Sequence, residues 1–197
     1  MEVRVDPLSG LRSLVAPERA DRPGALLDVA PAGPVDPADD PFAPGNEGQT
    51  PPELFALRDG EGAPWRVRVV PNRYPSVVPD APEPERAARP DLLGTAPARG
   101  AHEVIVNAPD PVQSLADLEP AQVADAMEVW RARMAHHAPR AACLHLFVNE
   151  RPEAGASLPH THAQLAALAK PLQKSGYGDY LLGKVGKVFP ELRATAL

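Results

Sequence analysis

The stretch Gly155-Ala156-Ser157-Leu158-Pro159-His160-Thr161-His162-Ala163-Gln164 is the most informative part of this 197-residue chain. Its second half alternates in polarity, which predicts a strand over residues 160–168. Every second side chain of a strand faces the same way, at intervals of roughly 6 to 7 Å. We therefore expect His160, His162 and Gln164 to share one face. Such a row is typical of an exposed surface, a metal pair or a catalytic site, and the spacing alone leaves all three open.

A turn of small residues precedes this strand. We expect the backbone amides of residues 155–157 and the Ser157 hydroxyl to approach a phosphate or another oxyanion closely. An imidazole beside a bound phosphate is a competent nucleophile, because it is largely unprotonated near pH 7. A second acceptor can then break the phosphorus–nitrogen bond, so the stretch indicates group transfer in two steps.

The remaining sequence predicts an α+β fold with an antiparallel sheet. Proline is concentrated in the first half, where 18 of the 26 prolines precede residue 101, so we expect a loop-dominated N-terminal region. Residues 80–100 are predicted to form a mobile surface excursion. Alternating or apolar segments predict further strands over 11–16, 65–70, 102–107 and 142–149.

Several side chains are assigned to the core by this pattern. Residues 120–138 predict a helix with Pro120 in its first turn. The following apolar sets are expected to pack inward: Val123, Met127, Trp130 and Met134 on the helix; Trp65, Val67 and Val69 on one face of the first long strand; Leu144, Leu146 and Val148 on another strand.

Composition excludes several classes of protein. A formal net charge of −6 gives no general attraction for nucleic acid or an anionic membrane. Cys143 is the only cysteine, which rules out an intrachain disulfide and a multi-cysteine zinc cluster. Because the N-terminus lacks a secretory pattern and no apolar run approaches about 20 residues, we expect a cytoplasmic protein. We expect one domain over 1–171 and a divergent tail over 172–197.

The stretch 155–164 resembles the active-site motif of the galactose-1-phosphate uridylyltransferase family, a branch of the histidine-triad superfamily. The resemblance implies a histidine-triad-like antiparallel sheet packed with one main helix. It implies that His162 attacks the α-phosphorus of a nucleoside-diphosphate sugar, releases a sugar 1-phosphate and passes the nucleotide, expected to be UMP, to a second sugar 1-phosphate. Gln164 stands where hydrolytic relatives carry a third histidine, which favours transfer over hydrolysis.

The resemblance covers about residues 6–171 and implies a set of site residues. Segments 6–10 and 16–23 are similar to an N-terminal signature whose two arginines contact substrate phosphate across a dimer interface, so a homodimer is expected. Segment 70–75 is similar to a base-binding segment. The resulting candidates are His162, Gln164, Ser157 and His160 as catalytic residues, and Asn149, Gly155, Asn72, Tyr74, Arg19 and Arg22 as substrate-binding residues.

The sequence also departs from the family pattern. Zinc-containing members place their four ligands at the positions of Asp40, Ala43, Pro111 and His160, so we expect no zinc here and no other cofactor. Thr161 stands where the family usually has proline. The other four histidines, at 102, 136, 137 and 145, are expected to be structural or surface residues.

Three functions remain open at this point. The first is a UDP-glucose:hexose-1-phosphate uridylyltransferase type of nucleotidyltransferase. The second is a related phosphorylase of the ADP-glucose type, with inorganic phosphate as acceptor. The third is a nucleotide-binding protein without catalysis, because family enzymes carry a second related half that supplies much of the sugar-phosphate pocket, and we expect the acceptor site to be incomplete in this chain.

Overall fold

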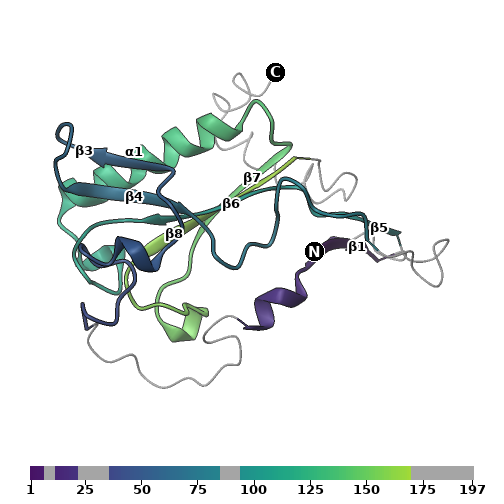
Figure 1. Ribbon diagram of the computed structural model, residues 1–197, viewed down its shortest axis with the longest axis horizontal. Coiled ribbons are helices and arrows are strands. Elements are labelled where there is room, and N and C mark those ends of the chain that lie inside the picture. Colours follow the sequence, from purple (N-terminus) through teal and green to yellow (C-terminus); the bar gives the residue numbers. More distant parts are fainter. Residues whose placement is uncertain (7–11, 22–35, 85–93, 170–197) are drawn as a thin grey trace, which may run out of the picture.

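The computed structural model describes residues 1–6, 12–21, 36–84 and 94–169. A five-stranded antiparallel sheet lies at its centre (Figure 1). In spatial order the strands are β3 (Phe55–Arg58), β4 (Trp65–Pro71), β6 (Gly100–Val106), β8 (His162–Leu168) and β7 (Cys143–Val148). The predicted α+β fold with an antiparallel sheet and one main helix is confirmed.

A second, smaller sheet lies beyond one end of the first (Figure 1). Its order is β2 (Arg12–Val15), β1 (Glu2–Val5) and β5 (Gly94–Pro97). The prediction at 11–16 is confirmed by β2, whereas β1, β3 and β5 were not predicted. β5 falls inside the excursion predicted at 80–100, whose residues 85–93 lie outside the described part, as does the predicted tail 172–197.

The proline-rich segment 36–54 contains no strand or long helix, in agreement with its composition. A proline removes a backbone donor and fixes φ, so short 3-10 turns replace regular elements. The 3-10 helices are η1 (Pro17–Asp21), η2 (Glu47–Gln49), η3 (Leu115–Asp117) and η4 (Pro152–Ala154).

The helix α1 (Pro120–His137) covers one face of the five-stranded sheet (Figure 1). Its most deeply buried residues are Ala126 and Val129, and Trp130 and Met134 pack against the same core. Met127, predicted to be buried, is 54% exposed. The prediction was wrong there because the buried face is centred one residue away, on the row that includes Ala126 and Val129, which puts Met127 on its flank.

The two faces of β4 pack into different clusters. Val67 and Val69 lie in the core under α1, as predicted. Trp65 instead packs with Val70 on the opposite face. Leu57 pairs with Val67 but Arg58 pairs with Trp65, so the register shifts by one residue at this point. A bulge of this kind turns the following side chain to the other face, which explains why simple alternation failed at Trp65.

A buried ion pair connects α1 to β6. Glu103 is 3% exposed and accepts hydrogen bonds from Arg133 at 2.6 and 2.9 Å and from His137 at 2.7 Å. Burial by itself raises the pKa of Glu103, but the hydrogen bonds from Arg133 and His137 hold it below its ordinary value. The carboxylate is therefore stable as an anion only while its helix partners are present.

We expect Arg133→Met to lower the free energy of unfolding by about 3 kcal/mol, because it leaves a buried carboxylate without its main partner. Arg131→Met provides the matched control on the same helix, since Arg131 is exposed, and should change stability by less than about 0.5 kcal/mol. Urea denaturation of both variants measures the difference. Equal stability of the two variants would show that the ion pair does not stabilise the packing of α1 on the sheet.

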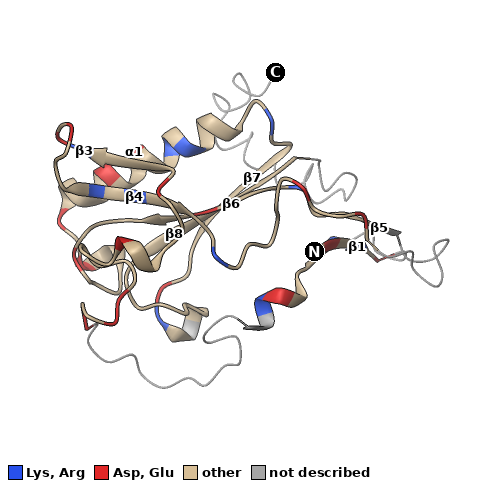
Figure 2. Ribbon diagram, viewed as in Figure 1, with Lys and Arg blue, Asp and Glu red and all other residues tan. Residues whose placement is uncertain are grey.

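Acidic and basic residues are interspersed along the described ribbon rather than separated onto two faces (Figure 2). Within the described ranges, no helix is both long enough and apolar enough to cross a membrane.

Candidate active site

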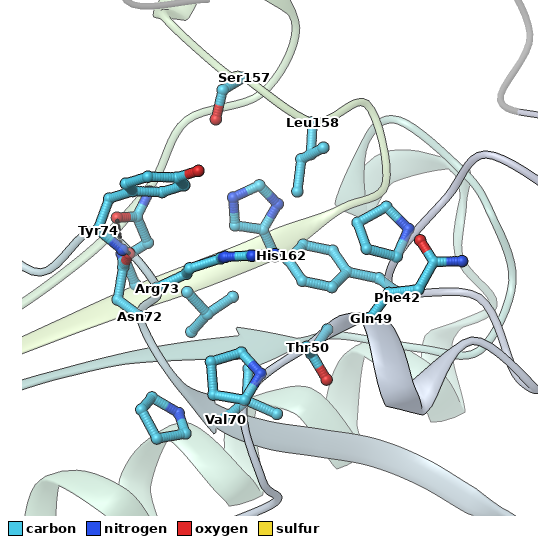
Figure 3. Close-up of a pocket in the computed structure, with 15 residues that line it drawn as sticks. Phe42, Gln49, Thr50, Val70, Asn72, Arg73, Tyr74, Ser157, Leu158 and His162 are labelled. Carbon is cyan, nitrogen blue, oxygen red and sulfur yellow. Dashed lines mark hydrogen bonds between the residues drawn. The ribbon is translucent and has the colours of Figure 1, made fainter. Parts of the chain in front are cut away.

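A pocket of about 180 Å³ opens where β4, β6 and β8 meet the loops around residues 42, 50 and 158 (Figure 3). This volume is several times the roughly 30 Å³ that a water molecule occupies, so the pocket admits a ligand group. Five of the predicted site residues line it, namely His162, Gln164, Ser157, Asn72 and Tyr74. The structure thus brings together residues that lie as far as 92 positions apart in the sequence.

His162 begins β8 and is 5% exposed. Its Nδ1 lies 2.8 Å from the backbone oxygen of His160. A carbonyl oxygen can only accept, so Nδ1 carries the hydrogen, and Nε2 bears the lone pair when the ring is neutral. The ring of Phe42 meets the imidazole edge-on at 5.3 Å. Backbone and aromatic contacts together fix the tautomer and the orientation of the candidate nucleophile.

His160 does not lie in the pocket. It precedes β8, is fully buried, and contacts Asp40 Oδ2 through Nδ1 at 2.6 Å and the carbonyl of Ala108 through Nε2 at 2.8 Å. The expectation that His160 shares a face with His162 and Gln164 was wrong, because the regular strand starts only at His162. His160 instead reaches the site through its backbone oxygen.

Thr161 also uses its backbone at the start of β8. Its amide donates to Val112 at 2.7 Å, and its hydroxyl accepts from the Asn107 side chain at 3.1 Å. Asn107 in turn accepts from Trp130 of α1 at 3.1 Å. A proline at position 161 would lack the amide hydrogen that this chain uses.

Gln164 lies between two polar neighbours, Asn72 and His102. Its Oε1 is 3.2 Å from Asn72 Nδ2 and 3.1 Å from His102 Nε2. Ser76 contacts the other ring nitrogen of His102, with its backbone amide donating at 3.0 Å. Burial, followed by the nearby positive charge of Arg19, lowers the pKa of His102 from 6.5 to about 4. His102 is therefore neutral near pH 7 and is part of the polar network behind the pocket.

The turn before β8 differs from the expected amide cradle. Gly155 adopts the left-handed region at φ 79°, where a residue without Cβ is favoured. The Gly155 amide donates to Pro152 at 2.9 Å, and the Ala156 amide donates to Arg151 at 3.1 Å. Both amides are thus hydrogen-bonded inside the turn. Of residues 155–157, Ser157 is the one that lines the pocket.

Two arginines lie near the candidate base site. Arg73 lines the pocket between Asn72 and Tyr74 (Figure 3). Arg19 donates a hydrogen bond to the carbonyl of Tyr74 in the same chain. Their positive charge offsets the net charge of the protein locally, as binding of an anion requires. Arg22 lies outside the described residues.

Some residues of the site were not predicted and some predictions lie elsewhere. Asn149 and Gly155 are not pocket-lining residues. Phe42, Arg73 and His102 were not assigned to the site. Arg73 stands inside segment 70–75, and its resemblance to the family is the signal that could have identified this residue. The role of His102 instead depends on contacts with residues 26 and 62 positions away in the sequence.

The side chains at the four positions considered for zinc, Asp40, Ala43, Pro111 and His160, do not fit a metal ion. Ala43 and Pro111 have no ligating side chain, and the Nδ1 of His160 is occupied by Asp40. Over the described ranges no group of three or more histidine, cysteine or acidic side chains is arranged to hold a metal ion.

We expect Asp40→Ala to lower the free energy of unfolding by about 3 to 5 kcal/mol, because it removes the carboxylate that contacts Nδ1 of the buried His160 ring. Its exposed neighbour supplies the control, since Asp39→Ala should have little effect on the free energy of unfolding.

Prolonged dialysis against EDTA should leave the thermal midpoint of the wild-type protein unchanged. A fall in the midpoint after dialysis would contradict a hydrogen-bonded, metal-free site.

The lowered pKa of His102 predicts a pH-dependent stability. The unfolded chain binds a proton on this side chain below about pH 6.5, and the folded chain only near pH 4, so stability falls as the pH drops through this window. The shift corresponds to on the order of 3 kcal/mol. His102→Asn should remove this part of the slope, as measured by urea denaturation at several pH values. Identical slopes in the two proteins would rule out the buried neutral histidine.

Comparison with known proteins agrees with this geometry. Residues 1–170 match the model of the galactose-1-phosphate uridyl transferase N-terminal domain. The chain is 29% identical to an ADP-glucose phosphorylase of Arabidopsis thaliana over 174 residues, which is 85% of this chain and 48% of that protein.

Two solved structures are also similar. A uridylyltransferase mutant has a TM-score of 0.66 and 29% identity, over 95% of this chain and 51% of that one. An ADP-glucose phosphorylase of Arabidopsis thaliana with bound ADP-glucose has a TM-score of 0.56 and 25% identity, over 94% and 56%. This chain spans about half the length of these relatives. The match over residues 1–170 places this chain in the galactose-1-phosphate uridyl transferase family, as the N-terminal domain.

Proposed function

We propose that this chain is a nucleotidyltransferase in which His162 carries the nucleotide. Nε2 of His162 attacks the α-phosphorus of a nucleoside-diphosphate sugar, and the bridging bond to the β-phosphate breaks. The electron pair leaves with the sugar 1-phosphate, and the nucleotidyl group remains on nitrogen. An oxygen of an acceptor phosphate then attacks the same phosphorus and restores the neutral imidazole.

The observation that carries this proposal is the 2.8 Å hydrogen bond from His162 Nδ1 to the His160 carbonyl. It leaves the lone pair on Nε2 in a ring that lines the pocket. Once phosphorus is bound, the ring becomes cationic, and the same carbonyl faces the nitrogen that shares the charge. This arrangement favours the charged intermediate more than the neutral ground state, as catalysis requires.

The acceptor defines two versions of the reaction. A hexose 1-phosphate as acceptor gives the uridylyltransferase type, with UMP as the group transferred, which we take as the leading proposal. Inorganic phosphate as acceptor gives the ADP-glucose phosphorylase type, which the likeness to the Arabidopsis protein supports. Arg73 and Arg19, near Asn72 and Tyr74, supply positive charge suited to the diphosphate in either version.

The first half of the reaction can be tested without an acceptor. Incubation with UDP-glucose or ADP-glucose labelled at the α-phosphorus should leave an acid-labile label on the wild-type protein. His162→Ala should take up no label, because it has no nucleophile. His145→Ala is the matched control, since His145 is an exposed histidine of β7 outside the pocket, and should be labelled like the wild type.

The labelled protein then identifies the acceptor. Release of label as UDP-hexose by hexose 1-phosphate supports the uridylyltransferase type, and release as ADP by inorganic phosphate supports the phosphorylase type. Undiminished labelling of His162→Ala, or a folded wild-type protein that binds nucleotide sugar without ever becoming labelled, contradicts the proposal. The second result would favour a nucleotide-binding protein without catalysis. Light scattering of the same sample tests the expected homodimer.

A further inference from the structure

The polar network behind the pocket has a single consistent arrangement of hydrogens. The backbone amide of Ser76 can only donate, so Nδ1 of His102 accepts its hydrogen bond at 3.0 Å. A ring that accepts at Nδ1 and is neutral carries its hydrogen on Nε2. The burial that lowers the pKa of His102 to about 4 keeps the ring in this neutral form. Nε2 of His102 is therefore a donor.

Asn72 is oriented in the same way by a different backbone group. Its Oδ1 accepts from the amide of Tyr74 at 2.8 Å, which fixes the carboxamide and makes its Nδ2 a donor. Nδ2 of Asn72 and Nε2 of His102 lie 3.2 Å apart. Because both carry hydrogen, this contact is not a hydrogen bond. The two donors instead converge on one acceptor.

That acceptor is Oε1 of Gln164, which lies 3.2 Å from the Asn72 donor and 3.1 Å from the His102 donor. A reversed carboxamide would place an NH₂ group against two other donors, which costs free energy in a buried site. The oxygen of Gln164 is thus held by His102 and Asn72. Its NH₂ group makes no hydrogen bond to any residue in the described part of the chain.

We propose that His102 is a positioning residue that, with Asn72, turns the Gln164 carboxamide so that its NH₂ group is offered to a phosphate oxygen of the substrate. Gln164 lines the same pocket as His162, two residues along β8, so its side chain projects from the same face of the strand. This inference rests on the proposed function for its substrate and on hydrogen-bond geometry for the orientation. It assigns to His102 a role that its sequence position did not reveal.

A double-mutant cycle tests whether His102 acts through Gln164. His102→Asn keeps a polar group near Ser76 but is too short to replace the Nε2 donor. We expect it and Gln164→Ala each to slow labelling of His162 about 10- to 100-fold, with little change in the concentration of nucleotide sugar that half-saturates the reaction. The double variant should be no slower than the slower single variant, because the second change removes nothing further. His102→Gln, which can extend a donor toward Gln164, should recover most of the rate.

The proposal is overturned if the rate losses of the two single variants multiply in the double variant, or if His102→Asn is labelled at the wild-type rate. A second measurement does not depend on activity. Nitrogen-15 NMR of the imidazole should show His102 at pH 7 as a neutral ring with hydrogen on Nε2, and hydrogen on Nδ1 would contradict the assignment. If the wild-type protein takes up no label, the proposed function fails, whereas the NMR result still decides the orientation of His102.

Discussion

A buried contact between Asp40 and His160 joins two parts of the chain that are 120 residues apart, and the site depends on it. Asp40 uses its second oxygen to accept the amide of Phe42 at 2.9 Å, and the Phe42 ring meets His162. The backbone oxygen of His160 accepts from His162. One carboxylate therefore supports the candidate nucleophile on two sides, through an aromatic ring and through a carbonyl. These four residues hold the proline-rich loop and the start of β8 in one arrangement.

Two histidines of the site are held in opposite tautomers by opposite backbone groups. The carbonyl of His160 places the hydrogen of His162 on Nδ1, whereas the amide of Ser76 places the hydrogen of His102 on Nε2. The first ring then presents a lone pair at Nε2 and the second a donor at the same atom. Since backbone groups cannot exchange their roles, both assignments follow from the fold rather than from the side chains alone.

The sequence predicted the elements whose period is regular and missed those set by long-range contacts. Alternation of polar and apolar side chains identified β4, β7 and β8, and helical spacing identified α1. In β8 the polar side chains that produced this alternation are themselves buried. The strands β1, β3 and β5 were missed, whereas β2, which is equally short, was predicted. Within the site, His162 and Gln164 could be read from the motif, but the positions of His160 and His102 could not. Each is fixed by partners elsewhere in the chain, at Asp40 and Ser76.

The same contacts also affect how the proposed nucleotidyl-histidine would react, with a phosphate acceptor or with water. Among the described residues that line the pocket, His162 is the only one whose side chain has an ordinary pKa near neutrality. In the proposed intermediate its Nε2 is bonded to phosphorus and cannot act as a base. Water would need a base at that stage, but Gln164 is a neutral amide and His102 already accepts a hydrogen bond from Ser76. A phosphate acceptor is an anion and needs no base to attack phosphorus. The described part of the proposed site offers donors and positive charge but no second base, which would favour an acceptor that brings its own nucleophilic oxygen.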